Sequence, residues 1–236
     1  MNTSVTQCKA FPLLPKSACA VLLICGASFF VSSATVTMNL DKFWQSVASF
    51  GGKNSADNRK QLDKVLADAK QAQRLQVIKS VNAYVNSVVT YEVDDVVWKE
   101  SDYWASPAEL LGRGQGDCED YAIAKYILLM KSGVPEENLR LIYVKAKIGG
   151  RRSSVTQAHM VLGYFHPGAS QPLILDSLVD EVLPARDRTD LTPVFSFNSQ
   201  GLWGPGNQKA SGSSTAKLSR WRNVFRKLEL EGITLG

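Results

Sequence analysis

One cysteine in this 236-residue sequence stands where a thiol can act as a nucleophile. Cys118 follows two helix-breaking glycines, Gly114 and Gly116, and precedes apolar residues at helical spacing as far as Met130. Asp117 is a suitable N-cap, so the pattern predicts a helix whose first turn contains Cys118. The free N–H groups and the dipole at a helix N-terminus stabilise a thiolate and can bind an oxyanion. This position favours nucleophilic catalysis.

A cysteine nucleophile needs a base to remove its proton and a third group to orient that base. The sequence has two histidines. His166 precedes a Pro-Gly pair that is typical of a turn and should be exposed, whereas His159 lies inside a predicted strand. We therefore interpret His159 as the candidate base.

Asp176 is the candidate for the orienting group. If Pro167 and Gly168 are the two central residues of a hairpin turn, the resulting register places His159 directly opposite Asp176. Directly opposed residues share one face of a sheet with Cβ atoms about 5 Å apart, so the carboxylate could accept from one imidazole nitrogen and leave the other for the thiol. Pro-Gly favours a type II turn, whereas two-residue hairpins prefer the primed types, so a longer loop would shift this register.

Each of the three residues also has a structural interpretation. A cysteine at a helix start can be structural, a histidine in a strand more often packs than catalyses, and an aspartate at a strand end can belong to a turn. Catalysis nevertheless requires this arrangement, whereas packing does not. The sequence therefore predicts a triad of Cys118, His159 and Asp176.

Three carboxylates lie next to the cysteine, on Asp117, Glu119 and Asp120. Their charges would raise the pKa of the thiol and oppose a thiolate. In one interpretation they cap the helix and face solvent. In the other a hard cation offsets them, and Ca²⁺ suits clustered carboxylates and carbonyls, although the spacing is not that of an EF-hand.

The elements that would position these residues form two groups, helices first and strands second. Helical spacing and capping residues predict a short helix or arm within 35–50, two helices within 57–89 that break near 70–73, a helix opening at 106–107, the helix after Cys118, and a terminal helix from 218. Alternating apolar residues predict antiparallel strands at 139–148, 156–165, 172–178 and 194–197, while 89–98 is expected to be a short extended segment or a loop. The order predicts an α+β fold with an N-terminal helical lobe packed on an antiparallel β-sheet.

The N-terminus is typical of a secretory signal peptide. Lys9 and Lys16 precede an uncharged apolar run over 18–31, and the small residues at 32–34 suit cleavage after Ala34. We therefore expect a signal peptide over 1–34 and one domain over 35–236. A retained anchor is the alternative, although the run is shorter than the roughly 20 residues of a membrane span.

Cleavage at that point would remove three of the four cysteines and leave Cys118 alone. An unpaired thiol in an exported protein is an accident, an intermolecular bridge or a reactive group, and the start of a helix favours the reactive group. The formal charge would fall from +5 because Lys9 and Lys16 are lost, and so mild a charge does not indicate nucleic-acid binding.

Longer motifs extend over nearly all of the predicted domain. They are DYWASPAE at 102–109, GDCEDYAIAKY at 116–126, GVP at 133–135, LRL at 139–141, AHMVL at 158–162, LD at 175–176, FSFN at 195–198 and GLW at 201–203. These motifs resemble those of the bacterial transglutaminase-like cysteine proteinases, whose best-known members are LapG-type periplasmic adhesin proteases.

The resemblance implies a papain-like, transglutaminase-like core with Cys118, His159 and Asp176 as the triad. It also implies a calcium ion near the 117–119 turn, with Asp117, Glu119 and Asp120 as ligands and Asp102 as an additional candidate.

The function implied by the resemblance is that of a periplasmic cysteine endopeptidase. Such an enzyme cuts a large surface adhesin at a pair of alanines in its N-terminal region, which releases the adhesin and promotes biofilm dispersal. An inner-membrane receptor sequesters the protease when cyclic-di-GMP is bound, and the protease itself is expected to be a monomer. Two alternatives use the same cleft: a transglutaminase that passes the acyl group to an amine, and a non-catalytic binding module.

Overall fold

The computed structural model describes Met1 and residues 36–52, 55–149, 153–207 and 209–235. The predicted signal peptide over 1–34 lies outside the described residues apart from Met1. The described residues from Val36 to Leu235 belong to one compact unit. No helix within the described ranges is long and apolar enough to cross a lipid bilayer.

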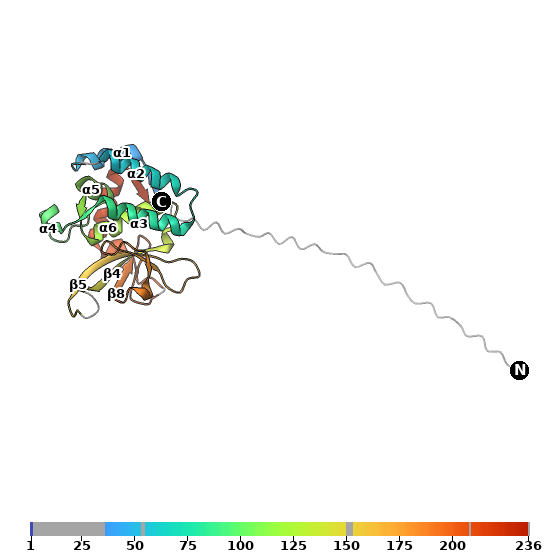
Figure 1. Ribbon diagram of the computed structural model, residues 1–236. Helices are drawn as coiled ribbons and strands as arrows, with labels where there is room; N and C mark the ends of the chain where they lie inside the picture. The colour runs from blue at the N-terminus through green and yellow to red at the C-terminus, as the bar shows by residue number, and fades with distance from the viewer. Residues whose placement is uncertain (2–35, 53–54, 150–152, 208, 236) are drawn as a thin grey trace. The chain divides into compact units, whose positions relative to one another are not determined.

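Helices form one side of this unit, as Figure 1 shows. The longer ones are α1 (Leu40–Ser49), α2 (Ser55–Asp68), α3 (Arg74–Val88), α5 (Pro107–Arg113), α6 (Cys118–Lys131) and α8 (Ser219–Leu230), and the short ones are α4 (Asp94–Val97) and α7 (Ser214–Lys217). The break predicted near 70–73 is confirmed between α2 and α3. The helix start predicted at 106–107 is also confirmed, and it forms a capping box in which the side chains of Ser106 and Glu109 each accept from the other residue's backbone N–H.

Strands form the other side. They are β4 (Leu139–Lys147), β5 (Thr156–Tyr164), β6 (Leu173–Leu175), β7 (Leu183–Pro184), β8 (Leu191–Phe197) and β9 (Leu202–Trp203). Within the described residues they make one antiparallel six-stranded sheet in the order β7-β6-β5-β4-β8-β9. The predicted α+β architecture, with helices packed on an antiparallel sheet, is therefore confirmed.

Two small strand pairs lie outside this sheet. β1 (Val36–Met38) pairs antiparallel with β10 (Ile233–Leu235), so the two ends of the described domain lie side by side. β2 (Thr90–Tyr91) pairs parallel with β3 (Gln115–Gly116). The second pair brings the segment after α3 next to the segment that leads into α6.

α6 lies at the centre of the core. Every residue from Cys118 to Met130 is buried, because the helix packs against α3 on one side and against the sheet on the other. Leu141 and Leu162, which pair across β4 and β5, belong to the core that contains α6, whereas their neighbours Ile142 and Val161 form a second apolar cluster. This alternation explains why the two strands could be recognised from period-two hydrophobicity.

Two predicted elements were wrong in part. Residues 89–98 contain β2 and the short helix α4 rather than only an extended segment or a loop. Asp94 and Asp95 lie in the first turn of α4, where acidic side chains suit the helix dipole. The strand predicted at 172–178 ends at Leu175.

The predicted hairpin register was also wrong. Pro167 and Gly168 do form a turn, closed by a bond from the Ala169 N–H to the His166 carbonyl, but β5 has already ended at Tyr164. The loop is therefore longer than two residues, and β6 pairs Leu162 with Leu175, which shifts the register by two residues from the prediction. A shift of two leaves each side chain on its original face, so His159 and Asp176 remain on one face as diagonal rather than direct neighbours.

Candidate active site

The start of α6 places Cys118 as predicted. Cys118 is the first helical residue, Asp117 is the N-cap, and the thiol is free and buried. Gly116 allows this close packing, because a Cβ at that position would lie 2.5 Å from Leu110 Cδ1 and 2.6 Å from Asp120 Oδ2. The helix start is thus fitted tightly against α5.

The acidic side chains converge at the same point. The Asp120 carboxylate accepts from the Asp117 N–H at 3.3 Å and from the Ala105 N–H at 2.6 Å, and it is fully buried. The pairing of β2 with β3 adds Asp94, which lies three residues after β2. Carboxylate oxygens of Asp94, Asp117 and Asp120 lie within 4.8 Å of one another, as do ligand atoms of Asp117, Cys118 and Glu119.

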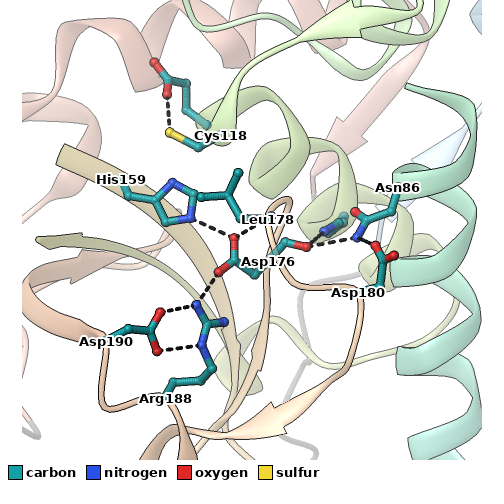
Figure 2. A network of polar contacts seen from close by, with 10 residues as sticks. Asn86, Cys118, His159, Asp176, Leu178, Asp180, Arg188 and Asp190 are labelled. Atoms are coloured by element: carbon teal, nitrogen blue, oxygen red, sulfur yellow. Dashed lines mark hydrogen bonds and ion pairs between the residues drawn. The ribbon is translucent and has the colours of Figure 1, made fainter. Parts of the chain in front are cut away.

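His159 and Asp176 form a direct contact. The distance from His159 Nε2 to Asp176 Oδ1 is 2.7 Å, and both side chains are almost completely buried. An ionised carboxylate only accepts, so Nε2 carries the proton and Nδ1 is left as an acceptor. Figure 2 shows the Cys118 sulfur and the Asp176 carboxylate on opposite sides of the imidazole ring.

Cys118 and His159 line one cleft of about 670 Å³. The cleft also contains aromatic side chains, including Tyr143 and Phe195, which stack with their ring centroids 5.2 Å apart.

The Cys118 thiol itself lies 3.0 Å from Glu119 Oε2, a contact drawn in Figure 2. Burial and the charge of Glu119 raise the pKa of the Cys118 thiol.

Asp176 is held at its side chain and at its backbone. Its Oδ2 accepts from Arg188 Nη2 at 2.7 Å, and its main-chain carbonyl accepts from Lys125 Nζ at 2.8 Å and from Asn86 Nδ2 at 3.0 Å. Burial lowers the pKa of Lys125 to about 7, although Asp176 acts in the opposite direction. Burial opposes the charge of Asp176, but hydrogen bonds from His159, the Leu178 N–H and Arg188 outweigh it and lower the pKa of Asp176 to about 2.

The acidic cluster has the chemistry of a calcium site. Burial and neighbouring carboxylates raise the pKa of Asp117 to about 8 and that of Asp94 to about 6. Burial is also the main cause of the raised pKa values of Glu119 and Asp120. Asp94 Oδ1 and Asp117 Oδ1 are buried without a hydrogen-bond partner. Oxygen donors that repel one another and lack protein partners suit a hard divalent cation.

Asp102, the additional candidate ligand, lines the same cleft as Asp117 and Glu119. Its carboxylate pairs with Arg220 at 3.0 Å and accepts from Trp104 Nε1 at 3.0 Å, and it is absent from both described groups of clustered ligand atoms. His166, the other histidine, is exposed as expected and lies outside the cleft.

Three further residues of the site were missed in the sequence. Asp94 lies in the segment 89–98, which was expected to be only extended or a loop, and its place in the acidic cluster depends on the β2–β3 pairing. Lys125 is a charged residue inside the apolar pattern of α6, which was a usable signal. Arg188 carries no local signal, because its contact with Asp176 depends on how the chain turns after β7.

The chain is similar to known proteins over most of its length. The family model of the bacterial transglutaminase-like cysteine proteinases matches residues 45–192. The structure of EGTA-treated Legionella pneumophila LapG is 34% identical, with a TM-score of 0.67, and the match covers 81% of this chain and 98% of that one. The calcium-bound form of the same protein is also 34% identical, with a TM-score of 0.66 and coverage of 81% and 99%. A search of curated proteins found no match.

Proposed function

Because the chain belongs to the bacterial transglutaminase-like cysteine proteinases, we propose that it is a calcium-dependent cysteine endopeptidase with Cys118, His159 and Asp176 as its triad. The observation that carries the proposal is the contact of 2.7 Å between Asp176 and His159, because His159 lines the same cleft as Cys118 in the first turn of α6.

Each residue of the triad has a defined task in this proposal. Asp176 keeps the proton on Nε2 of His159, so that Nδ1 can accept the proton of the Cys118 thiol. The thiolate attacks the scissile carbonyl, and the backbone N–H of Cys118 at the N-terminus of α6 stabilises the oxyanion. His159 then donates its proton to the leaving amine, and water hydrolyses the thioester.

The metal belongs to the same proposal. Asp94, Asp117, Glu119 and Asp120 would hold a calcium ion, whose positive charge would offset the carboxylates beside the nucleophile. The solved structures of the Legionella protein in a calcium-bound and an EGTA-treated form support this assignment.

Family membership is the ground for the proposed substrate, partner and location. We propose a periplasmic enzyme that cleaves a large surface adhesin near its N-terminus, promotes biofilm dispersal and is sequestered by an inner-membrane cyclic-di-GMP receptor.

The test combines cleavage of a substrate fragment with a search for amine adducts. The protein is incubated in calcium with a recombinant N-terminal fragment of a large surface adhesin from the same genome, with and without an amine acceptor. We expect two peptide fragments and no amine adduct, and we expect Cys118→Ala to be inactive with an unchanged melting temperature. Amine adducts would instead indicate a transglutaminase. Full biological function of Cys118→Ala would indicate a binding module.

A further inference from the structure

We propose that Arg188 is a positioning residue, whose guanidinium holds one oxygen of Asp176 so that the other oxygen stays on His159. This inference rests on the proposed function, because positioning matters only if His159 and Asp176 act together on Cys118.

The two oxygens of Asp176 have separate partners. Oδ1 lies 2.7 Å from His159 Nε2 and accepts from the Leu178 N–H at 3.1 Å, whereas Oδ2 lies 2.7 Å from Arg188 Nη2. The side chain of Asp176 has no exposed surface, and that of Arg188 is 5% exposed. The network in Figure 2 therefore fixes the rotation of the carboxylate plane from both sides.

Arg188 is itself held in place. Asp190 accepts from Arg188 Nε at 3.0 Å and from Nη2 at 2.7 Å, so two bonds orient the guanidinium before it reaches Asp176. Arg188 follows a short 3-10 turn, Ala185–Asp187, whose position is set by β7. The contacts form a chain from Asp190 through Arg188 and Asp176 to His159.

Arg188 lies away from the reacting atoms. It lines an apolar cavity of about 470 Å³ together with Ile142, Val161 and Ile174, and it is not among the described residues that line the cleft of Cys118. A substrate in that cleft would not contact the guanidinium. Its effect on catalysis must therefore pass through Asp176.

The other charged groups near Asp176 act differently. Lys125 on α6 bonds to the main-chain carbonyl of Asp176, and Asp180 is connected to that carbonyl only through Asn86 on α3. Among the described residues, Arg188 is the one charged side chain that bonds to the carboxylate itself, and its other side-chain partner is the imidazole of His159. Removing it would leave Oδ2 buried and unpaired, would free the carboxylate to rotate, and would favour protonation of Asp176.

The experiment compares Arg188→Met and Arg188→Lys with Arg186→Met in the calcium-loaded protein. Arg186 is a matched control, because it lies two residues away and its side chain is 71% exposed. We expect Arg188→Met to lower kcat roughly 10- to 100-fold, less than the ~10⁴-fold loss typical when an orienting carboxylate is neutralised. KM should change less than about twofold. The acid limb of the profile of kcat against pH should move to higher pH. Arg188→Lys should recover part of kcat. Arg186→Met should match the wild type.

Several outcomes would overturn the inference. One is an Arg188→Met protein with wild-type kcat and pH profile. Another is a loss of kcat that disappears when the rate is divided by the fraction of protein with a reactive Cys118 thiol, together with an unshifted acid limb. That result would mean that Arg188 only supports the fold. If Arg188→Met does not fold, Asp190→Asn replaces it and should shift the acid limb in the same direction by a smaller amount; no shift rejects the inference. Cleavage by Cys118→Ala, by contrast, would reject the proposed function itself.

Discussion

At the scale of single residues, Asp176 is the point on which the polar contacts of the site converge. Its side chain and carbonyl together accept bonds from β5, from α3, from α6 and from the segment after β7. A residue held in this way is ionised and immobile, as an orienting carboxylate must be.

This network predicts a specific loss of stability in acid. The pKa of Asp176 in the folded protein is lowered from 3.8 to about 2, so its contribution to folding is complete above pH ~4 and is lost as the pH falls through 2. We expect the wild type to lose on the order of 2 kcal/mol more than Asp176→Asn between pH 5 and pH 2. Urea unfolding of both proteins at each pH measures the difference, and parallel curves would contradict the prediction.

A second prediction concerns the triad as a unit. Cys118→Ala and His159→Ala should each abolish cleavage, and the double variant should be no slower than either single one, because all act on one proton transfer. Asp176→Asn should retain more activity than Cys118→Ala. Initial rates of adhesin cleavage decide both points, and a double variant much slower than either single variant would argue against a shared unit.

The positions of two proposed catalytic residues were predictable from the sequence, whereas those of Arg188 and Asp94 were not. Cys118 and His159 lie within elements whose periodicity is visible, so their positions could be predicted. Arg188 and Asp94 reach the site through tertiary contacts that leave no periodic trace in the sequence.

At the scale of secondary structure, the start of α6 is held by the β2–β3 pair on one side and by α5 on the other. The pair joins Thr90 to Gln115 and Tyr91 to Gly116, and it positions Asp94 beside Asp117. The acidic cluster thus connects two segments that are separate in the chain.

Calcium should therefore stabilise this junction. We expect the melting temperature to rise by several degrees with free Ca²⁺, since a ligand at 100 times its Kd contributes about 2.7 kcal/mol. Mg²⁺ should act poorly, because it demands near-octahedral geometry. Differential scanning calorimetry after chelation and dialysis provides the measurement.

Variants separate a true site from a general salt effect. Asp117→Asn should lose the calcium-dependent rise, while Glu229→Gln, at an exposed carboxylate on α8, should keep it. Equal melting temperatures of wild type with and without calcium would show that the cluster is only a helix cap.

Gly116 supplies a test of how tightly this junction is packed. Gly116→Ala would push a methyl group against Leu110 and Asp120, so we expect it to lower the free energy of unfolding by about 1–3 kcal/mol and to slow cleavage. Gly114→Ala is the comparison, because that residue has a φ of +67° with open space around it. Gly114→Ala should cost stability through backbone strain without slowing cleavage to the same extent.

The elements were more predictable than their register. Helix boundaries followed from capping residues and glycines, and the long strands followed from alternation. The β5–β6 register depends on where the strands end, and the turn at Pro167 and Gly168 did not determine that point.

At the scale of the whole molecule, the C-terminal segment closes the fold. β10 pairs with β1, Lys227 of α8 pairs with Glu109 of α5 at 2.8 Å, and Glu231 accepts from the Ser106 hydroxyl. These contacts join the end of the domain to the helix that packs beside α6. The α+β order was predictable, but three-residue strands carry too little periodicity to predict this closure.

Ile233 should therefore matter more than its position near the terminus suggests. It is fully buried, so Ile233→Ala should lower the free energy of unfolding by about 2–4 kcal/mol. Thr234→Ala, at an exposed position of the same strand, should change it by less than about 0.5 kcal/mol. Urea unfolding measures both, and equal effects would show that β10 adds little.

Because β1 pairs with β10, the order of the segments along the chain could be changed without changing the geometry of the site. Val36 lies opposite Leu235, so a short flexible linker could join these positions without crossing the fold. The chain could then be reopened at the exposed turn of Pro167 and Gly168. In such a circular permutant the aspartate would come first along the chain and the histidine last, with all three side chains in their present positions.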